Sequence, residues 1–250
     1  MSGIVVVLIL VSVSFLPVGL SVLWFRRRAL SIPPIFFLVF LAGGVLSLIL
    51  ALLLQSVIPQ NGVYSKWTSL FDLFIRISAS EEGARLVILF VIFHVIGVFY
   101  KRGINNHCPF GAPLPAPMGE IPKTTRYTPE KPMLFEGFAA GGGLLLGLSF
   151  AAVESAVYAT ANPELAVLRM ISSIPLHAAC GIRCGIAAFS LYSRHFWGIR
   201  HFIFAIVLHS FFNFMLPFGG LRAALGILLA LSSLASSARL IGGPERSFLK

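Results

Sequence analysis

The chain has 250 residues, of which 57% are hydrophobic and 11% charged, and its mean hydropathy is +0.91. Soluble domains are roughly half apolar and about a quarter charged, so this composition excludes an ordinary water-soluble domain. The net charge of +10 does not indicate a nucleic-acid partner, because the basic residues lie between apolar stretches rather than on one face of a soluble domain. We therefore predict an integral membrane protein whose surroundings are the lipid bilayer.

Several apolar stretches reach about 18 or more residues, which is the length that a helix needs to cross roughly 30 Å of hydrocarbon. In chain order, the predicted spans are residues 4–24, 33–58, 71–100, 134–158, 165–191, 201–216 and 221–240. Basic residues follow the first span instead of preceding it, which is the reverse of a cleavable signal peptide, so we expect a permanent span. The predicted fold is an all-α polytopic transmembrane helix bundle of about seven spans.

The basic residues also predict the topology. If the cluster at residues 26–28 is cytoplasmic, every later loop that is rich in Lys and Arg falls on the same side, as the positive-inside rule requires. This arrangement places the N-terminus outside and the C-terminus inside. The longest polar stretch, residues 101–132, contains seven prolines and is predicted to be an irregular cytoplasmic loop within a single transmembrane domain, residues 1–250.

Ionisable side chains in the spans are the candidates for function, because each costs at least about 2.5–3.5 kcal/mol at membrane depth unless it is paired. They are Asp72, Arg76, Glu81, Glu82, Arg85, His94, Glu154, Arg169, His177, Arg183 and His209, with Asn213 as a polar neighbour. The glycines of the spans, Gly143, Gly147, Gly181 and Gly185 among them, are interpreted as close helix-packing positions.

The third and fourth predicted spans carry the carboxylates. Glu81 and Arg85 are four residues apart, so a helix pairs them on one face and leaves Glu82 free for chemistry; the alternative is an exposed salt bridge at a solvated helix start. Glu154 has no basic partner in its own helix. It must therefore become neutral, pair with another helix or bind a metal, and a structural hydrogen bond is the alternative to a functional role.

The fifth and sixth predicted spans carry the histidines. His177, Cys180 and Cys184 share one helical face, a set that could hold a soft metal, although membrane cysteines are more often packing residues. His209 and Asn213 are four apart and face the bundle together, for chemistry or for an interhelical hydrogen bond. The rise of a helix places these histidines near mid-membrane and the acid of the fourth span nearer the outer surface.

The order of these motifs resembles the PrsW family of intramembrane proteases, within the superfamily of the CAAX endopeptidases and the bacterial CPBP proteins. The resemblance covers residues 80–213, the expected catalytic core helices, and consists of Glu81-Glu82-x-x-Arg85, Phe150-x-x-x-Glu154, His177 and His209-x-x-x-Asn213. It implies that Glu81, Glu82, Glu154, His177, His209 and Asn213 form the catalytic set. Glu154 stands where the CAAX endopeptidases have His, which favours the PrsW branch, and Arg85 stands where PrsW proteins often have Lys.

The resemblance implies cleavage of a membrane-anchored protein, such as an anti-sigma factor, in a bacterial or archaeal cytoplasmic membrane. A glutamate would take a proton from water, and a histidine or a metal would stabilise the oxyanion. Glu154, His177 and His209 would form a Zn²⁺ site with Glu81 or Glu82 as the base, and a metal-free glutamate mechanism stays open. The alternatives are a proton-coupled transporter with a Glu/His relay, against which the chain shows no matching halves, and a catalytically silent scaffold.

Overall fold

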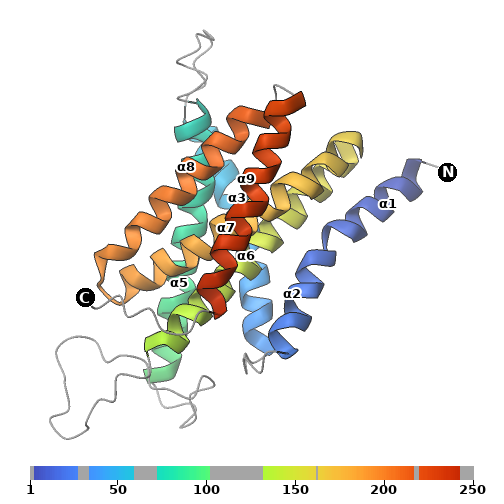
Figure 1. Cartoon of the computed structure of the whole chain (residues 1–250). Coiled ribbons are helices and arrows are strands. Elements are labelled where there is room, and N and C mark those ends of the chain that lie inside the picture. Colours follow the sequence, from blue (N-terminus) through green and yellow to red (C-terminus); the bar gives the residue numbers. More distant parts are fainter. Residues whose placement is uncertain are drawn as a thin grey trace, which may run out of the picture.

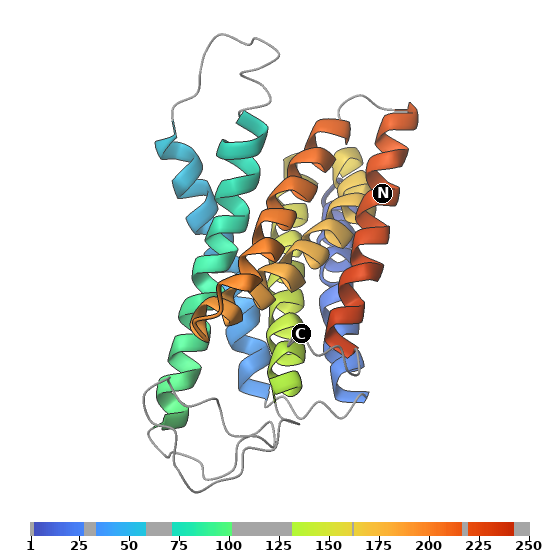
Figure 2. The same cartoon turned by 60° about the vertical axis from the view of Figure 1, so that its left-hand side comes forward.

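The computed structural model describes residues 3–27, 34–58, 72–101, 132–161, 163–216 and 220–242. These residues are almost entirely helical, and no strand occurs among them. The long helices run up and down through one bundle (Figures 1 and 2). The predicted all-α polytopic helix bundle is confirmed, whereas the orientation of its termini stays a prediction.

The helices follow the predicted spans closely. In chain order they are α1 (Gly3–Ser14), α2 (Leu16–Arg27), α3 (Pro34–Val57), η1 (Asp72–Ala79), α5 (Ser80–Lys101), α6 (Pro132–Ala161), α7 (Pro163–Tyr192), η2 (Phe196–Gly198), α8 (Ile199–Met215) and α9 (Gly220–Gly242). The first predicted span consists of α1 and α2, and the third consists of the π-helix η1 followed by α5. The predicted Pro-rich loop, residues 101–132, lies outside the described residues except at its two ends.

Six stretches of the described chain are long and apolar enough to cross a membrane, namely Ile4–Phe25, Ile35–Val57, Gly137–Ala161, Val167–Tyr192, Phe196–Met215 and Gly220–Ile241. Helix α5 is 22 residues long and differs from them in carrying Glu81, Glu82 and Arg85 at its start. Counting it, the bundle has the seven passes that the sequence predicts.

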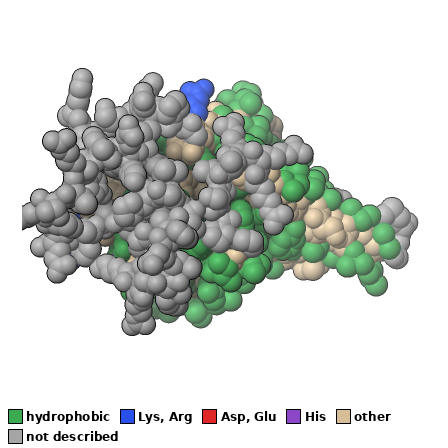
Figure 3. All heavy atoms as spheres, turned by 90° about the horizontal axis from the view of Figure 1, so that it is seen from below, with side chains coloured by type: hydrophobic (Ala, Val, Ile, Leu, Met, Phe, Trp, Pro, Cys, Tyr) green, Lys and Arg blue, Asp and Glu red, His purple; other side chains and the backbone are tan. Residues whose placement is uncertain are grey.

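Large hydrophobic side chains cover the outside of the bundle. Leu53, Ile171 and Leu228, on three different helices, are 59%, 58% and 61% exposed. Seen from one end of the bundle, the flanks of the described helices are hydrophobic (Figure 3). A soluble monomer rarely exposes so large an apolar surface, whereas lipid tails solvate it well. The surface therefore indicates an integral membrane protein.

Helix α7 is central, because it packs against α5, α6, α8 and α9. Its closest neighbour is α6, and glycines on both helices allow the approach. A Cβ at Gly143 would lie 2.1 Å from the carbonyl oxygen of Gly181, and a Cβ at Gly147 would lie 2.3 Å from that of His177. The packing interpretation of these glycines is confirmed. The contact holds the backbone of His177 directly against α6.

Candidate functional site

A cluster of buried polar side chains lies where α5, α6, α7 and α8 meet, with Arg85 at its centre. Arg85 is fully buried and donates hydrogen bonds to Glu82 and, over 3.3 Å, to Glu81. Its Nη2 also lies 2.6 Å from Nδ1 of His177, and its guanidinium stacks on the ring of Phe150 at 4.0 Å. The Glu81-Glu82-x-x-Arg85 motif forms these pairs because residues three and four apart share one face of a helix. One arginine thus joins three helices.

The hydrogen-bond partners determine which nitrogen of each histidine carries a proton. Arginine only donates, so Nδ1 of His177 accepts, and its Nε2–H donates to Glu154 over 3.0 Å. Nδ1 of His209 lies 2.6 Å from the carboxylate of Glu82 and therefore donates to it. Nε2 of His209 is left facing Oε2 of Glu81, at 3.8 Å. The two imidazole rings meet edge to face, 5.1 Å apart.

Glu154 finds the partner on another helix that the sequence required of it. One of its oxygens pairs with Arg169 at 2.6 Å and the other accepts from His177, so both partners come from α7. Arg169 in turn stacks on the ring of Tyr158 at 4.1 Å. The predicted difference in depth between Glu154 and His177 does not separate them, because α7 runs obliquely past α6 (Figure 2). Phe150, four residues before Glu154, shares its face and packs on His177.

The two adjacent glutamates differ in how far the cluster encloses them, and only Glu81 follows the prediction. The prediction that Glu82 is left free is wrong: its side chain is 0% exposed and accepts hydrogen bonds from Arg85, His209 and the thiol of Cys184. Glu81 does pair with Arg85 as predicted, yet its side chain is 10% exposed, and its contact with His209 is the long one. Glu82 points toward α7 and α8, whose polar groups enclose it, whereas Glu81 lies at the edge of the cluster.

One group within the described chain has the spacing of a metal site. Ligand atoms of Glu81, His177 and His209 all lie within 4.8 Å of one another, so the group could hold a metal ion. Its carboxylate is Glu81, whereas the sequence predicted Glu154, whose oxygens pair with Arg169 and His177. The three residues do not all offer a metal an unused lone pair, because Nδ1 of His177 already accepts a hydrogen bond from Arg85. A third ligand becomes free only when Arg85 releases His177.

The two cysteines are not part of that group. Cys180 donates to the carbonyl oxygen of Ala205 at 3.6 Å, and Cys184 lies 3.4 Å from Oε2 of Glu82. The soft-metal hypothesis therefore finds no support among the described residues, and the thiol of Cys184 instead helps to hold Glu82.

The remaining candidates are divided between this cluster and other parts of the bundle. Asn213 is partly buried one turn after His209 on α8, and among the described residues it makes no hydrogen bond to the cluster. Asp72 and Arg76 pair with each other at 3.3 Å on η1, and the exposed His94 contacts the carbonyl oxygen of Phe90. Sequence reasoning gave Arg169 no role, although its intramembrane charge was the signal that could have found it.

Comparison with protein-family models, with curated proteins and with solved structures finds no match for this chain. The interpretation of the cluster therefore depends on its own geometry, and the resemblance to the PrsW family stays a prediction carried by the motifs.

Proposed function

We propose that the chain is an intramembrane endopeptidase that hydrolyses a peptide bond of a membrane-associated protein. The observation that carries the proposal is the pair formed by Oε2 of Glu81 and Nε2 of His209, which face each other at 3.8 Å in a buried polar cluster. Polar atoms at such a separation are commonly bridged by water. A water that donates one hydrogen to each of these two acceptors turns a lone pair away from them, toward an incoming carbonyl carbon.

The reaction needs only groups of this chain. Glu81 takes one proton as the water oxygen bonds to the carbonyl carbon, and the carbonyl electron pair moves onto its oxygen. Collapse of this oxyanion breaks the carbon–nitrogen bond, and the leaving nitrogen receives the proton from Glu81. Glu82 orients His209 through its Nδ1–H. We assign the amide of Asn213, one turn along α8, as the hydrogen-bond donor to the oxyanion.

Exposure within the cluster indicates the side of access. The side chains of Arg85 and Glu82 are 0% exposed, that of Glu81 is 10% exposed, and those of Glu154 and Arg169 are 15% and 16% exposed. Water and substrate therefore enter from the end of the bundle where α6 joins α7. The predicted topology places this end on the non-cytoplasmic side, and an anti-sigma-factor-like substrate of a bacterial or archaeal membrane, as the resemblance implies, would be cut there.

The transporter alternative is less well supported. The hydrogen bonds that join His177 to Glu82 in the buried cluster run through Arg85. A guanidinium stays protonated and offers no acceptor, so it cannot take up a proton and pass it on. The silent scaffold differs from the endopeptidase only in the absence of cleavage.

The test is cleavage by the reconstituted full-length chain of a library of single-span reporter proteins that differ in their juxtamembrane segments. Glu81→Gln and His209→Ala should each lower turnover by about 10²–10⁴-fold, the usual contribution of a general base, while the protein still accumulates. Asp72→Asn is the matched control, because it removes a carboxylate that pairs with Arg76 outside the cluster. Unchanged turnover in both cluster variants would refute the proposal.

Zinc is the alternative means of activating the same water. Bound by Glu81, His177 and His209, it would act as a Lewis acid on the water and the carbonyl oxygen. Because Arg85 engages His177, we expect turnover to survive chelators and the purified protein to lack stoichiometric zinc. Stoichiometric zinc that disappears in His209→Ala would establish the metal-assisted route instead.

A further inference from the structure

Arg183 on α7 differs from three other arginines of the predicted spans, which lie on η1, α5 and α7. Arg76, Arg85 and Arg169 each pair with at least one carboxylate. The guanidinium of Arg183 instead lies over the ring of Phe204 at 4.0 Å and donates to the hydroxyl of Ser236 over 3.4 Å. Both partners are neutral. Within the described part of the chain, its positive charge has no carboxylate partner, although such a charge inside a membrane is costly unless it is compensated.

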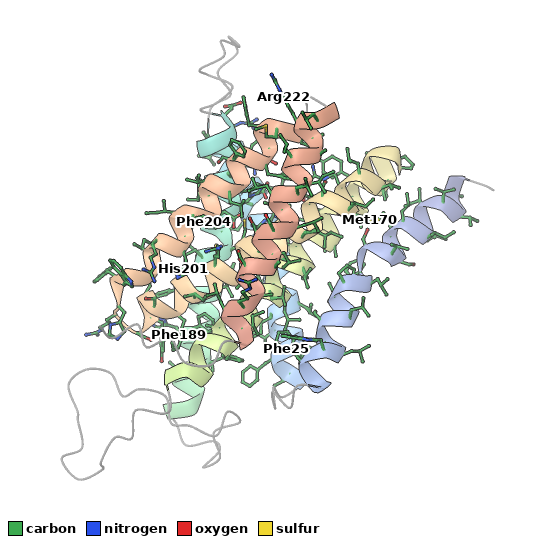
Figure 4. All side chains as sticks on the ribbon, in the orientation of Figure 1. Phe25, Met170, Phe189, His201, Phe204 and Arg222 are labelled. Carbon is green, nitrogen blue, oxygen red and sulfur yellow. The ribbon has the colours of Figure 1, made fainter. Side chains whose placement is uncertain are left out.

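Further basic side chains stand beside it. Arg200 and His201 lie in the first turn of α8, and His201 precedes Phe204 by three residues, so it shares the face of α8 that Arg183 contacts. Nδ1 of His201 is buried and has no hydrogen-bond partner within the described residues. Figure 4 shows His201 and Phe204 on α8, far along the bundle from Arg222. Helices α7 and α8 thus bring basic side chains together, and Ser236 on α9 accepts a hydrogen bond from one of them.

Exposed aromatic side chains mark the level of this site. Phe196 and Trp197 of η2, just before α8, are 77% and 69% exposed, and Arg200 lies over the Trp197 ring at 4.7 Å. Exposed tryptophan next to arginine is typical of the boundary between lipid tails and headgroups. The basic set therefore lies close to headgroup level, at the end of the bundle that the predicted topology places toward the cytoplasm.

We propose that Arg183 and His201, with Ser236 positioning the guanidinium, form a binding site for an anionic phosphate group, supplied by the headgroup of an anionic phospholipid. Basic pockets between transmembrane helices at the cytoplasmic side bind headgroups of this kind. Arg183 provides charged donors, His201 provides a ring nitrogen, and Ser236, whose hydroxyl donates to the carbonyl of Ser233, lies within reach of the same guanidinium. The site shares no residue with the Glu81 cluster, so it is independent of the proposed peptidase activity.

The test measures lipid binding to the purified full-length chain by native mass spectrometry. Phosphatidylglycerol should bind, and Arg183→Gln should weaken this binding about tenfold through loss of a charge-assisted contact. Arg183→Lys, which keeps the charge, should retain most of it. Arg222→Gln is the matched control, because it removes one positive charge at the other end of the bundle (Figure 4).

Two further measurements distinguish a lipid headgroup from a soluble phosphate, and a second variant replaces Arg183→Gln if that variant does not fold. Phosphatidylcholine should bind less, and inorganic phosphate should not compete; competition that depends on Arg183 would assign the site to a soluble phosphate compound. If Arg183→Gln does not accumulate, His201→Gln replaces it, with an expected loss of about threefold. Equal phosphatidylglycerol binding by the native chain and by Arg183→Gln or its replacement His201→Gln, or an equal loss in Arg222→Gln, would overturn the proposal.

Discussion

Arg85 and Arg183 place the same functional group in neighbouring parts of one bundle, with opposite surroundings. Arg85 is fully enclosed and contacts two carboxylates, an imidazole and an aromatic ring. Arg183 is partly exposed and contacts a hydroxyl and an aromatic ring. The first charge is compensated from within the chain and organises other side chains. The second is available to a partner from outside.

The strongest test of this comparison removes each arginine in turn. Arg85→Gln should lower the free energy of unfolding by about 3–5 kcal/mol, because it leaves buried carboxylates without their cation. Arg183→Gln should change it by less than about 1 kcal/mol, since no described carboxylate depends on it. Denaturant-induced unfolding in mixed micelles measures both. Equal losses would contradict the distinction between the two sites.

The second prediction separates the adjacent glutamates. Glu82→Gln should cost about 2–3 kcal/mol of stability, because Glu82 accepts hydrogen bonds from Arg85, His209 and Cys184. Glu81→Gln should cost about 1 kcal/mol, because Glu82 still compensates Arg85. Comparing unfolding with turnover in the two variants checks this, since Glu81→Gln should lose turnover while it keeps most of its stability. The reverse pattern would return the catalytic role to Glu82.

The third prediction concerns the glycine contact that positions His177. Gly147→Ala should destabilise the chain by about 1–3 kcal/mol, because the new Cβ would lie 2.3 Å from the carbonyl oxygen of His177 and would push α6 and α7 apart. Gly19→Ala is the control, because a Cβ there meets no atom within 4 Å. A thermal unfolding scan of both variants decides the matter, and equal melting temperatures would disprove the packing role.

The smallest expected effect is at Cys184. Cys184→Ala should lower turnover about threefold by removing a weak hydrogen bond to Glu82, and Cys184→Ser should restore it. Cys180→Ala is the matched control, because that thiol donates to the carbonyl of Ala205 instead. The kcat of the reporter cleavage is the quantity to compare. An equal decrease for both alanine variants would show that the thiols only fill space.

Most of the fold followed from the sequence because a helix in lipid must satisfy its own backbone hydrogen bonds, so length and hydropathy suffice to locate it. The site was predicted less completely. The Glu81–Arg85 pair followed from helical spacing, which is local. The enclosure of Glu82 did not, because it depends on His209 and Cys184, which are 127 and 102 residues away in the chain.

The sequence by itself determined that the chain is a bundle of membrane-spanning helices and which few ionisable residues those helices carry. Only the tertiary structure decided that Glu81 faces Nε2 of His209 while Glu82 accepts from its Nδ1–H, that Glu154 pairs with Arg169, and that Arg183 has no carboxylate partner among the described residues. The physical reason is that the pairing of buried charges depends on the rotation and crossing of helices, which hydropathy does not encode.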